Sequence, residues 1–264
     1  MFGSGGQLGS ELVRLLGPQS AVTHREVSIT DAAAVESLVS RRRPDVVFNC
    51  AAYNAVDRAE KERDIAFAIN GDGPRHLAVA CRRAGASLVH FSTNFVFDGR
   101  HDEPYVEADL PEPISVYGAS KLAGERGVLE AGSHVVVVRT AAVYGGPSSF
   151  PMRILDRARA GEELSVVSDQ HVNPTFARDL AAVAVELAAD GIAGIVHAVA
   201  EGCCGWDDFA RAALAEAGVE SEVRSVSTSG YPAAARRPAN GCLASTRIAP
   251  LRPWREALHE ALNP

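Results

Sequence analysis

GSGGQLG, residues 3–9, is the stretch that decides the fold. Gly3, Gly6 and Gly9 form a GxxGxxG pattern at the start of a segment with helical spacing. Glycines at such a turn let backbone N–H groups approach a pyrophosphate at the N-terminus of the following helix. Ordinary turns also contain such glycines, so the rest of the sequence must decide between a nucleotide-binding turn and a simple loop.

Strand and helix patterns alternate after this turn. Continuous apolar runs predict buried parallel strands, and apolar residues at helical spacing predict helices between them. The expected strands are 21–24, 26–29, 45–52, 87–93, 134–145 and 194–200. The expected helices are 7–16, 31–44, 55–70, 74–85, 115–132, 151–161, 176–190, 206–218 and 254–263. This alternation predicts an α/β fold, a Rossmann-type doubly wound parallel sheet with a smaller C-terminal substrate-binding lobe.

The domain boundary is expected near residue 145. Residues 1–145 are predicted to form a dinucleotide-binding Rossmann lobe, and residues 146–264 mainly a substrate-binding lobe, with about 175–200 packing back on the first. Only Met1 and Phe2 precede the glycine turn, where a central strand is expected. We therefore expect a truncated first strand that exposes apolar surface and unpaired backbone groups.

Composition excludes several classes of protein. The formal net charge of the 264-residue chain is −7, which argues against nucleic-acid binding. No apolar run approaches the ~20 residues that span a bilayer, so we expect no membrane segment and a cytoplasmic protein. The cysteines show no CxxC spacing, which predicts no metal site and reduced thiols throughout. These cysteines are Cys50, Cys81, Cys203, Cys204 and Cys242.

Two local patterns could carry chemistry. Tyr117 and Lys121 lie four residues apart in a predicted helix, so both project from one face. A nearby ammonium favours the phenolate and lowers the pKa of a tyrosine, making it a usable proton donor. Thr93 ends a predicted buried strand, at the sheet edge where α/β proteins bind ligands. Taken singly, each pattern also fits a surface pair or a capping residue.

Taken together, the segments resemble one family. The similarity is carried, in order, by GGQLG, PDVVFNCAAYNAVDRAE, STNFVFDG, YGASKLAGE, RTAAVYG, DQHVNPT and RRPANGCL. This set resembles the dTDP-4-dehydrorhamnose reductase family, within the extended short-chain dehydrogenase/reductases. The resemblance implies NAD(P)H-dependent reduction of the C4 ketone of a nucleotide-linked 4-keto-6-deoxyhexose. It leaves the oligomeric state open, with a homodimer as one alternative.

The resemblance also implies residue roles. Tyr117 would protonate the C4 alkoxide, Lys121 would lower the pKa of Tyr117 and hold the nicotinamide ribose, and Thr93 would bind the ketone oxygen. The implied cofactor contacts are Gly3, Gly6, Gln7, Leu8, Gly9, Ser28, Ile29, Ala52, Tyr53 and Asn54, together with Tyr117 and Lys121. The implied substrate contacts are Thr93, Asn94, Ala142, Asn173 and Arg237, the last as a partner for the diphosphate.

The choice of cofactor is argued from one basic pair. His24 and Arg25 stand where an acidic residue would favour the free ribose hydroxyls of NADH. Because a basic residue suits a 2′-phosphate, we expect Arg25 to favour NADPH over NADH.

Departures from the family pattern leave the preferred sugar open. Asn94 and Phe95 replace an Asp and a Tyr beside Thr93, and Ala142 stands where relatives often have a tryptophan. A non-catalytic binding protein on the same fold is therefore an alternative, since the regulatory subunit of methionine adenosyltransferase also resembles this family. A dehydratase is disfavoured, because no Asp-Glu pair follows Thr93, and an epimerase is a weaker alternative.

Overall fold

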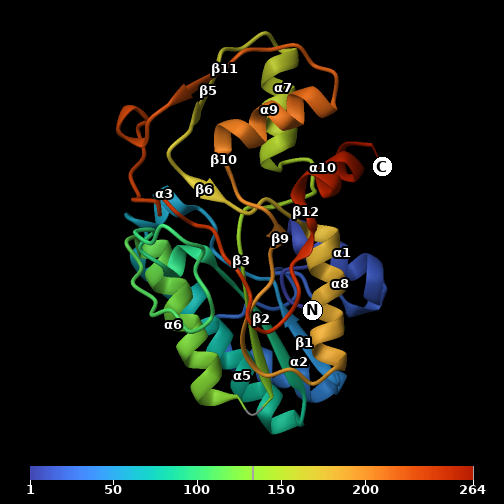
Figure 1. Ribbon diagram of the computed structural model, residues 1–264. Coiled ribbons are helices and arrows are strands. Elements are labelled where there is room, and N and C mark those ends of the chain that lie inside the picture. The colour runs from blue at the N-terminus through green and yellow to red at the C-terminus, as the bar shows by residue number, and fades with distance from the viewer. Residues whose placement is uncertain (133, 264) are drawn as a thin grey trace.

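Four parallel strands form the central sheet of the computed structural model, which describes residues 1–132 and 134–263 (Figure 1). In sheet order they are β1 (Val46–Asn49), β2 (Ser87–Thr93), β3 (Val135–Thr140) and β8 (Gly194–His197). Each strand is joined to its neighbour in parallel register. Parallel connections require crossovers, and the helices between these strands supply them.

The N-terminus extends the sheet beyond β1, and the expectation that it exposes apolar surface and unpaired backbone groups is wrong, because Met1 and Phe2 are buried and paired. Phe2 forms parallel bridges to Asn49 on one side and to Val22 on the other. Its N–H donates to the carbonyl of Phe48 at 2.9 Å, and the N–H of Cys50 donates to the carbonyl of Phe2 at 3.0 Å. After Phe2 the chain first pairs on one side, at Val22, and then crosses to the other side, where β1 begins the rest of the sheet. Such a switch point is where α/β sheets bind ligands.

The two expected strands at 21–24 and 26–29 are largely wrong. Val22 forms only a single bridge, and residues 26–29 form no strand. The reason is local, because the N–H groups of Glu26 and Val27 donate back to the carbonyl of Thr23. A chain that closes such a turn cannot offer those amides to a neighbouring strand.

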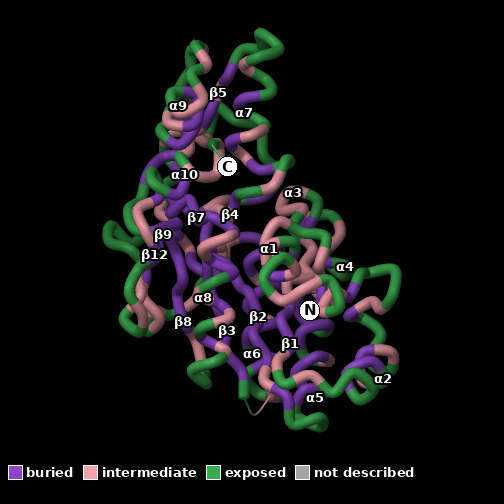
Figure 2. Tube along the Cα trace, turned by 90° about the vertical axis from the view of Figure 1, so that its right-hand side faces the viewer, coloured by how far each residue is buried: buried purple, intermediate pink, exposed green. Residues whose placement is uncertain are grey.

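Helices cover both faces of the sheet. One face packs against α2 (Ala32–Arg42), α5 (Gly73–Ala84) and α6 (Val116–Ala131). The other packs against α1 (Gln7–Leu16) and α8 (Ala177–Ala189). Successive strand residues point to opposite faces, so Val47 joins the first core and Phe48 the second. Figure 2 shows the strands buried between these two helical layers, which confirms the predicted doubly wound α/β class.

The helix expected over 55–70 is divided. The structure has α3 (Val56–Ala59), α4 (Arg63–Phe67) and a π-helical turn at Ala68–Asp72 that runs directly into α5. Within this turn, the side-chain amide of Asn70 donates to the Ser120 hydroxyl at 3.0 Å and accepts from the Tyr53 N–H at 2.8 Å. The wide turn thus ties the end of β1 to α6.

A second lobe stands above the carboxyl ends of the sheet strands (Figure 1). Its α7 (Phe150–Arg159) and α9 (Trp206–Glu216) pack around a parallel pair, β5 (Leu164–Val167) and β11 (Val223–Val226). It also includes α10 (Trp254–Leu262). The shorter pairs are β4 (Val143–Tyr144) with β7 (Thr175–Phe176), β6 (His171–Val172) with β10 (Cys204–Gly205), and β9 (Ala200–Glu201) with β12 (Leu251–Pro253).

The expectation that every cysteine is a free thiol is wrong. Cys203 and Cys242 form a disulfide, with their Cα atoms 6.1 Å apart, a separation that such a bond accepts. The two residues are 39 positions apart in the sequence, and only the folded lobe brings them together. The thiols of Cys50, Cys81 and Cys204 are free.

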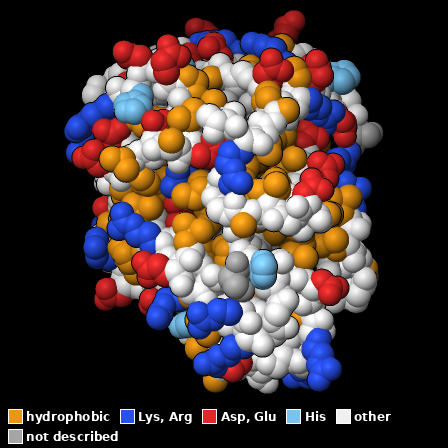
Figure 3. Space-filling view, turned by 60° about the horizontal axis from the view of Figure 1, so that its bottom comes forward, with side chains coloured by type: hydrophobic (Ala, Val, Ile, Leu, Met, Phe, Trp, Pro, Cys, Tyr) orange, Lys and Arg blue, Asp and Glu red, His pale blue; other side chains and the backbone are white. Residues whose placement is uncertain are grey.

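The described residues include no helix that is both long enough and apolar enough to cross a membrane. On the face shown in Figure 3, acidic and basic side chains are interspersed, and neither sign of charge dominates. That face therefore lacks the continuous basic stripe typical of nucleic-acid binding.

Candidate active site

A cavity of about 720 Å³ opens between the two lobes, at the carboxyl ends of β1, β2 and β3. Strand ends supply its floor, through residues 49–52, 91–95 and 140–143. Its basic side chains are Lys121, Arg153, Arg157 and Arg237. Within the described part of the chain, no Asp or Glu side chain lines it. In a protein with a net charge of −7, this basic lining is suited to anionic ligands.

The N-terminus of α1 forms one end of the cavity. Gly6, Gln7, Leu8 and Gly9 line it, and no described side chain caps the helix at Gly6. Gly3 has a φ of 77°, and a Cβ at Gly9 would overlap the carbonyl oxygen of Gly3, so the turn needs both glycines. The first amides of α1 therefore face the cavity at the positive end of the helix dipole, where a diphosphate fits.

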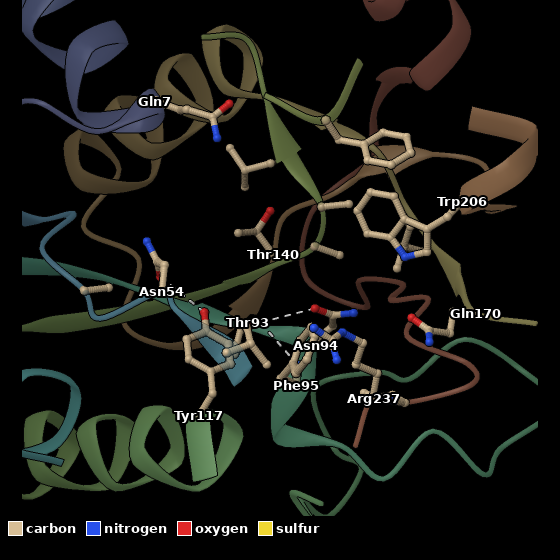
Figure 4. Close-up of a pocket in the computed structure, with 18 of the residues that line it drawn as sticks. Gln7, Asn54, Thr93, Asn94, Phe95, Tyr117, Thr140, Gln170, Trp206 and Arg237 are labelled. Carbon is tan, nitrogen blue, oxygen red and sulfur yellow. Dashed lines mark hydrogen bonds between the residues drawn. The ribbon is translucent and has the colours of Figure 1, made fainter. Parts of the chain in front are cut away.

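Thr93 ends β2 on the cavity floor (Figure 4). Its Oγ1 accepts a hydrogen bond from the Phe95 N–H at 3.2 Å and donates to the Asn94 Oδ1 at 3.2 Å. The Asn94 amide is itself fixed, since it donates to the carbonyl of Gly241 at 2.9 Å. This chain of bonds orients the Thr93 hydroxyl and links it to the second lobe.

Tyr117 lies in the first turn of α6, capped by Ser115, and its ring reaches into the cavity beside Thr93. The phenol donates to Asn54 Oδ1 at 3.5 Å. Burial raises the pKa of Tyr117 to about 12, although a hydrogen bond with Thr93 acts in the opposite direction. The expected lowering of this pKa by the Lys121 ammonium is not seen, and the phenol holds its proton at neutral pH.

Lys121 lies one turn further along α6 and is 3% exposed. Its Nζ donates to the carbonyl of Phe91, inside β2, at 2.7 Å. Burial lowers the pKa of Lys121 to about 8, and Glu125 acts to raise it. The ammonium is thus desolvated, held against the sheet and close to its titration point near neutral pH.

The chain matches a family model described as "RmlD substrate binding domain" over residues 1–264. The chain belongs to this family. A dTDP-4-dehydrorhamnose reductase of Mycobacterium tuberculosis (strain ATCC 25618 / H37Rv) is 42% identical over 277 residues, covering 98% of this chain and 90% of the relative. The Spore coat polysaccharide biosynthesis protein SpsK of Bacillus subtilis (strain 168) is 40% identical, covering 99% of this chain and 95% of the relative. The family expected from the sequence motifs is confirmed.

Solved structures agree with this assignment. The dTDP-4-dehydrorhamnose reductase from Bacillus anthracis str. Ames, in complex with NADP, is 36% identical with a TM-score of 0.95, covering 99% of this chain and 97% of that one. The UDP-glucose 4-epimerase of Thermotoga maritima, at 20% identity and a TM-score of 0.81, shares the fold. The expected Rossmann-type architecture is therefore shared well beyond the RmlD family.

The cofactor contacts inferred from the family pattern fall into two groups. Ala52 and Asn54 line the cavity beside the α1 turn, whereas Arg25, Ser28 and Ile29 do not. The Ile29 side chain is 5% exposed and packs in the core beneath the sheet. Gly3 does not line the cavity and instead forms part of the turn before α1. Tyr53 does not line the cavity either, and its hydroxyl donates to Glu62.

The substrate contacts inferred from the pattern also divide. Asn94, Ala142 and Arg237 line the cavity, and Ala142 has a φ of 42°, a left-handed conformation uncommon outside glycine. Asn173 does not line it. Its side-chain amide donates to the carbonyl of Gly202 at 2.9 Å and accepts from the Leu243 N–H at 2.8 Å. Asn173 therefore links the backbone at Gly202 to the backbone at Leu243 and does not contact the cavity.

Sequence reasoning missed most of the upper wall. The additional lining side chains include Gln170 and Trp206 (Figure 4), and also Phe150, Ile154, Thr228, Tyr231, Arg153 and Arg157. One signal could have found part of it. Positions 150, 153, 154 and 157 repeat at helical spacing, and two arginines interrupt an otherwise apolar face. Across the described residues, no cluster of His, Cys, Asp or Glu suitable for a metal ion occurs.

Proposed function

We propose that this protein is an NADPH-dependent reductase of the dTDP-4-dehydrorhamnose reductase type, which reduces the C4 ketone of a nucleotide-linked 4-keto-6-deoxyhexose. One observation carries the proposal. A single cavity contains the uncapped N-terminus of α1, the side chains of Thr93, Tyr117 and Lys121, and a basic lining without a described acidic side chain. A cofactor diphosphate and a substrate diphosphate both need such an environment.

The residues present fit a nicotinamide cofactor. The amides at Gln7, Leu8 and Gly9, at the uncapped helix end, would bind its diphosphate, and Lys121, which lines the same cavity, would bind its ribose hydroxyls. When bound, the reduced nicotinamide supplies the hydride. Every other requirement of the reaction falls on side chains of this chain, which must orient the ketone and supply one proton.

Tyr117 is proposed to supply the proton. Hydride addition at C4 moves the carbonyl π electrons onto oxygen, and the Tyr117 O–H bond then breaks as the new O–H bond forms. A phenol with a pKa near 12 still protonates a secondary alkoxide, which is the stronger base. The Thr93 hydroxyl is placed to hydrogen-bond the same oxygen and to stabilise its growing charge. Lys121 stabilises the phenolate that remains.

Two alternatives receive less support. A non-catalytic binding protein would not need Thr93, Tyr117 and Lys121 in one cavity, yet all three line it. Dehydration requires acidic groups near the sugar, and no described Asp or Glu lines the cavity. The neutral Asn94 in particular brings no charge to this position.

The test is a panel of nucleotide-linked 4-keto-6-deoxyhexoses mixed with purified protein, with NADPH absorbance followed over time. We expect oxidation of NADPH that depends on both sugar and enzyme, with dTDP-linked 4-keto sugars among the substrates. Tight binding of NADPH without oxidation by any panel member would favour the non-catalytic alternative. Sugar isomerisation without consumption of NADPH would favour an epimerase.

The pH dependence of turnover should report Lys121. Its pKa of about 8 means that the ammonium is lost as pH rises through this value, and with it the stabilisation of the phenolate. We therefore expect kcat for ketone reduction to be level below pH 8 and to fall above it. Lys121→Arg keeps the charge at all accessible pH values, so its residual activity should lack this fall. A wild-type profile that is flat from pH 7 to 10 would contradict the role of Lys121.

Cofactor preference is expected to depend on Arg25, which lies in the exposed turn after Val22. Arg25→Ala should lower kcat/KM with NADPH about 10-fold or more, the effect of losing a charge-assisted hydrogen bond, and should leave kcat/KM with NADH nearly unchanged. Arg41→Ala, an exposed position on α2, is the matched control. Equal or better rates of the wild type with NADH, at matched concentrations, would overturn the preference for NADPH.

A further inference from the structure

One face of α7 forms the upper wall of the cavity. Phe150, Arg153, Ile154 and Arg157 are spaced at i, i+3, i+4 and i+7, and all four line the cavity. Helical geometry places such positions on one side of the helix. Residues 165–167 of β5, which packs against α7 in the same lobe, also line the cavity. The face is apolar except for its two arginines.

The arginines of the cavity differ in how many of their donors are free. Arg157 donates through Nε to Glu162 at 2.7 Å. Arg237 forms a bidentate pair with Asp57, with a shortest distance of 2.6 Å. Among the described residues, the side chain of Arg153 has no hydrogen-bond or ion-pair partner, although it lines the same cavity. Its guanidinium therefore offers its full planar set of donors.

Arg153 and the N-terminus of α1 line the same cavity from different lobes. The uncapped amides of α1 lie in the first lobe, whereas Arg153 lies in the second lobe, one turn into α7. Thr93, at the end of β2, and Tyr117, on α6, come from the first lobe and lie side by side in Figure 4. The cavity continues from Tyr117 to α7, so a substrate with its ketone at Tyr117 has room to extend toward Arg153.

We propose that Arg153 binds the diphosphate of the sugar-nucleotide substrate, and this inference rests on the proposed function. A guanidinium presents two parallel N–H groups to phosphate oxygens, which gives a short, charge-assisted and oriented contact. Arg237, already paired with Asp57, is by contrast a link between α3 and the loop that carries it, and its role toward substrate is secondary. Arg153 thereby sets the position of the nucleotide relative to the hydride acceptor.

The experiment compares three proteins: the wild type, Arg153→Gln and Arg159→Gln. Calorimetry measures the Kd of each for dTDP alone and for NADPH. Steady-state kinetics on the preferred 4-keto sugar give kcat and KM. Arg153→Gln is expected to raise the Kd for dTDP and the KM for the sugar about 10- to 100-fold. The contact forms in the ground state and in the transition state alike, so kcat at saturation should change little. Arg159, exposed on α7 and outside the cavity, is the matched control and should leave every value unchanged.

Each other outcome decides against the inference. Wild-type and Arg153→Gln proteins with equal Kd for dTDP would overturn it, while the proposed function would stand if both reduce the sugar. Weaker NADPH binding with unchanged dTDP binding would place Arg153 at the cofactor. A wild type that neither binds dTDP nor reduces any 4-keto sugar would overturn both proposals. Unchanged melting temperatures of the variants exclude misfolding as the cause.

Discussion

Tyr117→Phe is expected to lower kcat for ketone reduction by about 10²- to 10⁴-fold, the usual contribution of a positioned general acid. The substitution removes one hydroxyl from a ring that is 8% exposed and packs edge-on against Phe95, with ring centroids 5.4 Å apart. That packing survives in phenylalanine. The hydrogen bond from the phenol to Asn54 is long, at 3.5 Å, so little stability depends on it.

A matched variant separates chemistry from packing. Tyr144 is also buried, with a hydroxyl 3.5 Å from the carbonyl of Trp254, but it lies outside the cavity lining. Tyr144→Phe should therefore retain nearly full kcat, and both variants should bind NADPH with the wild-type Kd in a fluorescence titration. If Tyr117→Phe kept more than a tenth of wild-type kcat, another group would have to supply the proton.

The floor of the cavity could be predicted from the sequence because its signals are local. Gly3, Gly6 and Gly9 lie within seven residues, Tyr117 and Lys121 within one helical turn, and Thr93 at the end of the expected strand 87–93. Each of these patterns is visible within a few neighbouring residues and depends only on the local turn, helix or strand. The parallel sheet then brings the separate signals to one edge.

The upper wall could not be predicted in the same way, because it depends on contacts between distant segments. Asn173 lies in the motif DQHVNPT, which predicts a substrate contact. Its side-chain amide instead forms hydrogen bonds with Gly202 and Leu243, which are 29 and 70 residues away in the sequence. The bond between Cys203 and Cys242 likewise exists only once the second lobe is folded. Nothing in the local sequence around any of these residues encodes such a partner.

Arg139→Met is expected to lower the free energy of unfolding by about 3–5 kcal/mol, the cost of leaving a buried charge without its partner. Arg139 on β3 and Glu125 on α6 are each 1% exposed and form a bidentate pair at 2.7 and 2.9 Å. The guanidinium also lies 5.1 Å from the centroid of the Phe97 ring. Urea denaturation followed by circular dichroism measures the change. Arg83→Met, which breaks an exposed pair with Glu36, should cost less than about 1 kcal/mol.

The double variant Arg139→Met/Glu125→Leu tests why the single change is costly. If the penalty comes from the unpaired Glu125 carboxylate, removing that charge should restore most of the lost stability, because apolar groups of similar size fill the site. If the penalty came from packing alone, the double variant would be no more stable than the single one. Glu125 also raises the pKa of Lys121, one turn away on α6. The double variant should therefore lose the Lys121 ammonium at lower pH than the wild type, so that its kcat falls earlier as pH rises. Restored stability together with this shifted profile would show that the single change is costly because it leaves the Glu125 carboxylate unpaired, and that Glu125 sets the charge of Lys121.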